Sequence, residues 1–132
     1  MSALGEVLVL DDEDIVCERL GDYLGKQGFS VETFTESQKA IDRLAQKEFD
    51  VVVTDLKMKG PNGLEVMHFV RRQAPRTQVI IITGYASMAA AREAEYSGVF
   101  DFITKPFQME NLGAMVKKAV KKAGKQKERS EQ

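Results

Sequence analysis

The stretch VVVTDLKMKGPNG, residues 51–63, decides the fold of this chain because it joins three different structural signals. Val51–Val53 is apolar and β-branched throughout, which is typical of a strand buried on both faces of a parallel sheet. The GPNG sequence at 60–63 is a strong turn signal, and the apolar residues after it recur at helical spacing. The stretch therefore predicts a strand, a loop and a helix in succession, with Asp55 at the carboxyl end of the strand.

The same alternation of strand and helix patterns continues on both sides of this stretch. Short apolar runs at Val7–Leu10, Val79–Ile82 and Val99–Ile103 predict three more buried strands, whereas Val31–Phe34 mixes apolar with polar residues and predicts an edge strand. Segments with helical patterns lie around residues 16–24, 40–44, 64–70, 86–94 and 112–123. Such alternation predicts an α/β fold with a doubly wound, five-stranded parallel sheet and helices on both faces.

Length and composition indicate one globular domain. With 132 residues, 43% of them hydrophobic and 30% charged, the chain can build a single core and lacks the composition of a disordered or membrane protein. We expect a domain over residues 1–123 and a polar tail, or the start of a linker, over 124–132, where no side chain is apolar. No apolar run approaches the roughly 20 residues that span a bilayer, and no signal segment opens the chain, so we expect a cytoplasmic protein.

The charge pattern gives no reason to expect nucleic acid or a membrane as a direct partner. The net charge of −1 provides no general attraction to either. Lysines are concentrated over residues 117–127, but no aromatic residue is interleaved, so we interpret this segment as a solvated helix end. The single cysteine, Cys17, cannot form an internal disulfide, and we expect it to pack in or near the core.

Residues with reactive or metal-binding side chains follow four of the expected strands. Asp11 and Asp12 follow the first, Asp55 the third, Thr83 the fourth and Lys105 the fifth. In doubly wound sheets, ligands bind at the carboxyl ends of the strands, so these side chains should meet at one edge. Carboxylates with no nearby histidine or thiol indicate Mg²⁺, which also leaves room for phosphate oxygens.

This set of side chains suits phosphoryl transfer to an aspartate. Asp55 beside Mg²⁺ can act as the nucleophile toward phosphorus. The ammonium of Lys105, and the hydroxyl of Thr83 with the backbone N–H of Gly84, can neutralise the remaining phosphoryl oxygens. Taken singly, each residue has an ordinary structural explanation: the acids can cap a helix, Asp55 can form a turn, and Thr83 and Lys105 can be surface residues. Their joint occurrence at four strand ends argues against those explanations.

Four segments carry a family resemblance: VLVLDDED, VVVTDLKMKGPNGLEV, VIIITGYAS and FDFITKPF resemble the motifs of response-regulator receiver domains. The resemblance extends from about Glu6 to about Lys122. Within the family, the sequence is most similar to the receivers of bacterial enhancer-binding transcription activators. It implies a flavodoxin-like fold with strand order 2-1-3-4-5. It also implies a phosphoacceptor signalling domain of a two-component system.

The resemblance assigns roles at the phosphorylation site. It implies that Asp55 accepts the phosphoryl group and that Asp12 and Asp55 bind Mg²⁺ directly. Asp11 would act mainly through a metal-bound water, and the backbone carbonyl of Lys57 would complete the protein ligands. Lys105 would pair with the phosphoryl group, and the Lys105-Pro106 peptide bond would be cis.

The resemblance also assigns a switch. Thr83 would move toward the phosphoryl oxygens, and Phe102 would follow it inward and reshape the surface of the fourth helix, fifth strand and fifth helix. Lys57 and Tyr85 would flank the path of the hydrolytic water and so set the phosphate lifetime. Two positions depart from the common pattern: Lys59 stands where proline is frequent, and Phe102 replaces a tyrosine.

The implied partners are a sensor histidine kinase and an output partner or effector domain, with a phosphorylation-dependent homodimer as a further expectation. We expect no enzymatic activity beyond self-phosphorylation and autodephosphorylation. Three alternatives remain: a degenerate receiver that only binds proteins, a phosphatase with an aspartate nucleophile, and a flavodoxin-like electron carrier. Lys57 stands where such a phosphatase needs a second aspartate, and no phosphate-cradling loop follows the first strand. The single histidine, His68, fits a surface or packing position.

Overall fold

The computed structural model describes residues 3–84 and 98–131. The helix expected at 86–94 lies outside the described residues. The described elements are β1 (Glu6–Leu10), α1 (Asp14–Lys26), β2 (Ser30–Phe34), α2 (Ser37–Gln46), β3 (Val51–Asp55), α3 (Gly63–Gln73), β4 (Gln78–Thr83), β5 (Asp101–Thr104) and α5 (Met109–Glu131). Strands and helices alternate as predicted from β1 to β4, and β5 is followed by α5.

The five strands form one parallel sheet in the order β2-β1-β3-β4-β5, which confirms the expected topology. Leu10 of β1 pairs with Thr54 of β3, and Asp55 pairs with Ile82 of β4. This register places the first residue after β1 beside the last residue of β3. The carboxyl ends of the central strands therefore meet at one edge of the sheet.

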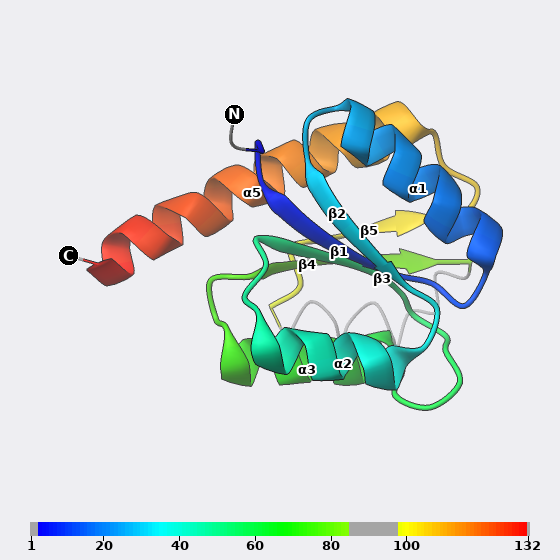
Figure 1. Ribbon diagram of the computed structural model, residues 1–132, viewed down its shortest axis with the longest axis horizontal. Coiled ribbons are helices and arrows are strands. Elements are labelled where there is room, and N and C mark those ends of the chain that lie inside the picture. Colours follow the sequence, from blue (N-terminus) through cyan, green and yellow to red (C-terminus); the bar gives the residue numbers. More distant parts are fainter. Residues whose placement is uncertain (1–2, 85–97, 132) are drawn as a thin grey trace.

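Helices cover both faces of the sheet, with α1 and α5 on one face and α2 and α3 on the other (Figure 1). Side chains alternate between the faces along each strand, so Val7 and Val9 pack toward α1 and α5 while Leu8 and Leu10 pack toward α2 and α3. The central strands β1, β3 and β4 are buried almost throughout. Their continuous apolar runs, predicted to be buried on both faces, are confirmed.

The two outer strands are more exposed than the central ones. β2 is half exposed, as the mixed polarity of its sequence predicted. β5 was expected over Val99–Ile103 as a strand buried on both faces, and this part of the prediction was wrong. The observed strand Asp101–Thr104 is intermediate or exposed at each residue, because it is the last strand in the sheet order and pairs with a neighbour on one side only.

Helix α5 is longer than its apolar face. Its buried apolar side chains recur at helical spacing and are Leu112, Val116, Ala119 and Ala123, while Met115 is half buried. Residues 124–131, expected to be a polar tail or the start of a linker, continue α5 as helix, and its last turns extend beyond the sheet (Figure 1). No helix in the described ranges is both long enough and apolar enough to cross a membrane.

The buried face of α1 should contribute far more to stability than the exposed amino-terminal segment. Leu24 is completely buried, whereas Leu4 is 60% exposed. We expect Leu24→Ala to lower the free energy of unfolding by about 2–5 kcal/mol, since it removes buried contacts and leaves a cavity. Leu4→Ala should change it by less than about 0.5 kcal/mol. Urea denaturation measures both, and equal losses would contradict the described packing.

Candidate functional site

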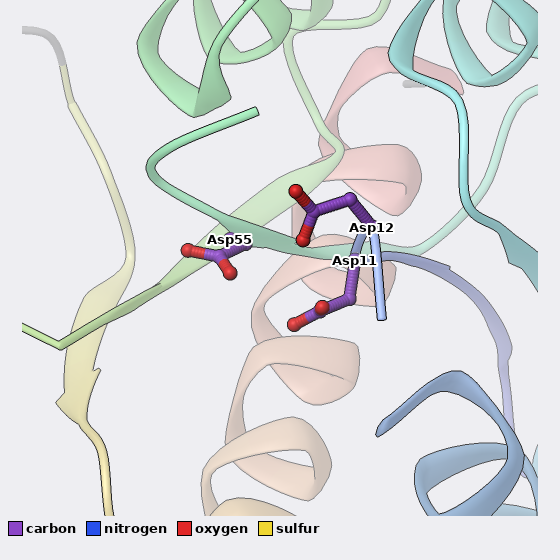
Figure 2. Close-up of side chains that lie close together, drawn as sticks. All are labelled: Asp11, Asp12 and Asp55. Atoms are coloured by element: carbon purple, nitrogen blue, oxygen red, sulfur yellow. The ribbon is translucent and has the colours of Figure 1, made fainter. Parts of the chain in front are cut away.

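Three carboxylates meet at the carboxyl edge of the sheet. Asp11 and Asp12 follow β1, and Asp55 ends β3, so all three are positioned by the central strand pair (Figure 2). One carboxylate oxygen from each lies within 4.8 Å of those of the other two. Asp11 is completely buried and Asp55 is 8% exposed, whereas Asp12 is exposed. Two buried anions therefore lie together, with a third at the entrance.

Lys105 supplies positive charge to this cluster. Its Nζ lies 3.0 Å from Oδ2 of Asp55 and 3.4 Å from Oδ2 of Asp11, with Oε1 of Glu13 at 3.8 Å. The backbone N–H of Lys105 donates to the carbonyl oxygen of Thr83 at 2.9 Å, which aligns the residue after β5 with the end of β4. The Lys105-Pro106 peptide bond is cis, as predicted.

Burial and charge oppose each other in this site. Burial raises the pKa of Asp11, and the nearby carboxylate of Asp55 raises it further, while the backbone N–H of Glu13 and the ammonium of Lys105 counteract them. Burial by itself would lower the pKa of Lys105, but its hydrogen bond to Asp55 and its attraction to both carboxylates raise that pKa overall. Lys105 therefore stays protonated, and keeping Asp11 ionised in the folded protein costs free energy.

The donor set fits a hard divalent cation. All three side chains offer oxygen, and the thiol of Cys17, buried in the core as expected, donates to the carbonyl oxygen of Asp11 at 3.3 Å. Mg²⁺ binds through one or two carboxylates and retains several waters, which suits one exposed and two buried groups. The acidic pocket that the sequence predicted is therefore assembled, and its occupation by Mg²⁺ stays a prediction.

A hollow of about 190 Å³ lies beside Asp55, with Lys57, Thr83, Gly84 and Lys105 in its wall. It is several times larger than the volume of about 30 Å³ that one water takes in the liquid. The backbone N–H of Lys57 donates to Oδ1 of Asp55 at 3.3 Å. The structure thus gathers Asp55, Thr83 and Lys105 around one space, as the sequence predicted.

The residues expected to form the switch share one face of the sheet. Ile81 pairs with Phe102, and Thr83 pairs with Thr104, so Phe102 and Thr83 point toward the same face. Phe102 is half buried and packs against the cluster under α2 and α3. Tyr85 and the helix expected at 86–94 lie outside the described residues.

Two supporting features were missed in the sequence. A Cβ at Gly63 would lie 2.5 Å from the carbonyl oxygen of Asp55, so only glycine lets α3 begin directly against the strand end. The hydroxyl of Ser37 donates to the carbonyl oxygen of Lys59 at 3.0 Å. The position of Gly63 within a turn signal was visible in the sequence, but nothing near Ser37 indicated a contact with residue 59.

Fold and site together define a doubly wound α/β domain with an acidic, lysine-bridged site at its carboxyl edge. A model of the response regulator receiver domain matches residues 7–117. The chain therefore belongs to the response regulator receiver domain family, which consists of signalling domains of two-component systems. This result favours a signalling domain over a phosphatase or an electron carrier.

Relatives with similar sequences are named as regulators. The chain is 33% identical to the regulatory protein AtoC of Escherichia coli K12 over 128 residues, covering 97% of this chain and 28% of AtoC. It is 32% identical to the DNA-binding transcriptional regulator NtrC of the same organism, covering 88% of this chain and 25% of NtrC. The expected resemblance to receivers of enhancer-binding activators is confirmed, and the chain spans about a quarter of each of these relatives.

Solved structures agree with the fold. NtrX from Brucella abortus in complex with ADP superimposes with a TM-score of 0.86 at 25% identity, covering 98% of this chain and 30% of that one. The beryllofluoride-activated DrrB receiver domain gives 0.82 at 26% identity, covering 92% of this chain and 99% of that one.

The raised pKa of Asp11 predicts a pH-dependent cost in the metal-free protein. A carboxyl whose pKa is raised by folding holds its proton more tightly in the folded state. The free energy of unfolding therefore falls as the pH rises from 3.8, the ordinary pKa of the carboxyl, through the raised pKa. We expect Asp11→Asn to raise the free energy of unfolding at pH 7, and the gain to disappear below pH 3.8. Thermal unfolding with a chelator measures this, with the exposed Asp22→Asn as control. A gain that persists in acid would contradict the explanation.

Proposed function

We propose that this chain is a phosphoacceptor domain that takes a phosphoryl group from a sensor histidine kinase onto Asp55 and relays the change through its surface. The observation that carries the proposal is the convergence of Asp55, Thr83 and Lys105 around one hollow, with Asp11 and Asp12 alongside. None of these residue types is distinctive alone. Together they supply a nucleophile, a cation, a hydroxyl and metal ligands in one place.

In the proposed transfer, a carboxylate oxygen of Asp55 forms the bond to phosphorus while the bond between phosphorus and the donor's leaving atom breaks. Lys105 neutralises one phosphoryl oxygen, and the hydroxyl of Thr83 with the N–H of Gly84 donates to another. Mg²⁺, held by Asp11, Asp12, Asp55 and the carbonyl of Lys57, would neutralise developing negative charge. The phosphoryl group displaces the carboxylate of Asp55 as the main partner of Lys105.

The lifetime of the phosphorylated state depends on access of water to phosphorus. Lys57 is exposed and borders the hollow beside Asp55. We propose that the side chains of Lys57 and Tyr85 obstruct the hydrolytic water, so that the domain dephosphorylates itself slowly. Turnover of other substrates is not part of this function.

The output is proposed to pass through Phe102. Thr83 and Phe102 share a face of the sheet, so movement of Thr83 toward a phosphoryl group opens space into which the ring can turn. This rearrangement would alter a surface that includes β5, α5 and the helix expected at 86–94, where we propose that an effector domain, an output partner or a second copy binds. The name of NtrC, a DNA-binding transcriptional regulator, supports transcriptional control as the output.

Acetyl phosphate with Mg²⁺ should add one phosphoryl group to the protein, because Asp55, Lys105 and Thr83 already surround the reacting position. Asp55→Asn should abolish the addition, and Asp22→Asn should not, since Asp22 is an exposed residue of α1. Intact-mass spectrometry measures both. An unchanged yield in Asp55→Asn would refute the assignment, and no addition to the wild-type chain would favour the degenerate receiver that only binds proteins.

Activation should change the association state or the surface protection of the domain. We expect a monomer without phosphate, and self-association or protection over residues 86–122 once beryllofluoride occupies the site, because the switch residues lead to that surface. Light scattering and amide hydrogen exchange, with and without beryllofluoride, measure the two effects. Constant mass together with constant exchange in these residues would exclude the proposed output surface.

A further inference from the structure

Ser37, the first residue of α2, makes a hydrogen bond that does not serve its own helix. Serine at a helix start commonly caps the helix through its hydroxyl. Here the N-cap residue is Glu36, which makes no side-chain capping bond, and the hydroxyl of Ser37 instead donates to the carbonyl oxygen of Lys59, 22 residues away. Ser37 is 2% exposed while Lys59 is exposed, so the bond joins a buried donor to a part-buried position in the loop.

The acceptor lies in the loop over residues 56–62, which connects Asp55 to α3. Gly60 adopts a φ of +75°, and a Cβ added there would lie 3.4 Å from Oγ of Ser37, so the turn of the loop is closely fitted to this hydroxyl. The far end of the loop is held by Asn62, whose Oδ1 accepts from the N–H of Glu65 at 2.9 Å. The proposed metal ligand, the carbonyl of Lys57, lies between the end of β3 at Asp55 and the anchored Lys59.

The link between Ser37 and Lys59 also lies beside the acidic cluster. Both residues line a hollow of about 520 Å³ between the loops that follow β1, β2 and β3, and Asp12 lines the same hollow. Asp12 therefore belongs both to the three-carboxylate cluster and to the hollow where α2 holds the loop. A shift of Lys59 away from Ser37 would alter the backbone two residues from Lys57 and next to Asp12.

We infer that Ser37 is a positioning residue for phosphoryl transfer, because its hydroxyl holds the 56–62 loop in the conformation in which the carbonyl of Lys57 would bind the metal. The inference rests on the proposed function. Loss of the donor would remove the hydrogen bond that ties the carbonyl of Lys59 to α2, so the loop would rearrange to recover a partner. Groups that orient metal ligands typically change metal affinity by about 10–100-fold when removed.

The test is Ser37→Ala, which deletes the hydroxyl and retains the Cβ. We expect Mg²⁺ affinity, measured by calorimetry, to fall about tenfold. Phosphorylation by acetyl phosphate should need correspondingly more Mg²⁺ but return toward the wild-type rate at saturation, because Asp55, Thr83 and Lys105 are untouched. Amide exchange in residues 57–62 of the metal-free protein should become faster.

The matched control is Thr77→Val, which removes the same kind of bond at the opposite edge of the sheet. Thr77 is completely buried, and its hydroxyl donates to the carbonyl oxygen of Phe49 at 2.6 Å, just before β4 and β3 begin. We expect this variant to lose thermal stability while its Mg²⁺ affinity and its exchange in residues 57–62 stay unchanged.

Unchanged Mg²⁺ affinity and unchanged loop exchange in Ser37→Ala would overturn the role of Ser37. Equal loss of Mg²⁺ affinity in both variants would also overturn it, since the effect would then reflect general destabilisation. A wild-type chain that takes no phosphoryl group would overturn the proposed function itself, whereas normal phosphorylation in Ser37→Ala at every Mg²⁺ concentration would overturn only this inference.

Discussion

Two buried carboxylates held side by side are the constraint around which the carboxyl edge is organised. The pairing of Leu10 with Thr54 in the parallel register of β1 and β3 forces Asp11 and Asp55 together. Like charges at this separation repel, and burial strengthens the repulsion. Lys105 offsets this repulsion with a hydrogen bond to each carboxylate. The ends of β1, β3 and β5, which are remote in sequence, are therefore linked by the attraction between one lysine and two aspartates.

The rest of the fold keeps these charges from separating. A carboxylate on a flexible loop would turn to water, but Asp55 ends a strand buried on both faces and Asp11 directly follows another. The two apolar clusters on either side of the sheet stabilise that frame. Stability is thus concentrated in the core, while the edge retains charges whose arrangement the proposed cation and phosphoryl group would change.

The same arrangement gives the site two different kinds of support. Strand ends place Asp11, Asp55 and Thr83 rigidly, because sheet hydrogen bonds determine their backbone positions. The loop over residues 56–62 depends instead on contacts such as those of Ser37 and Gly63. We infer that the charged groups are preorganised by the sheet, and that the loop carbonyl proposed as a metal ligand is adjusted by neighbouring loops.

The sequence by itself determined the parallel sheet and which strand-end residues come together, because apolar runs and helical spacing are local patterns and strand-end residues of such a sheet must meet at one edge. The strand order came from the family motifs. Only the tertiary structure decided which side chains compensate the charges and how exposed each strand is. The half-exposed β5, the distances from Lys105 to both carboxylates, and the bond from Ser37 to Lys59 depend on contacts between distant residues, which no local pattern encodes.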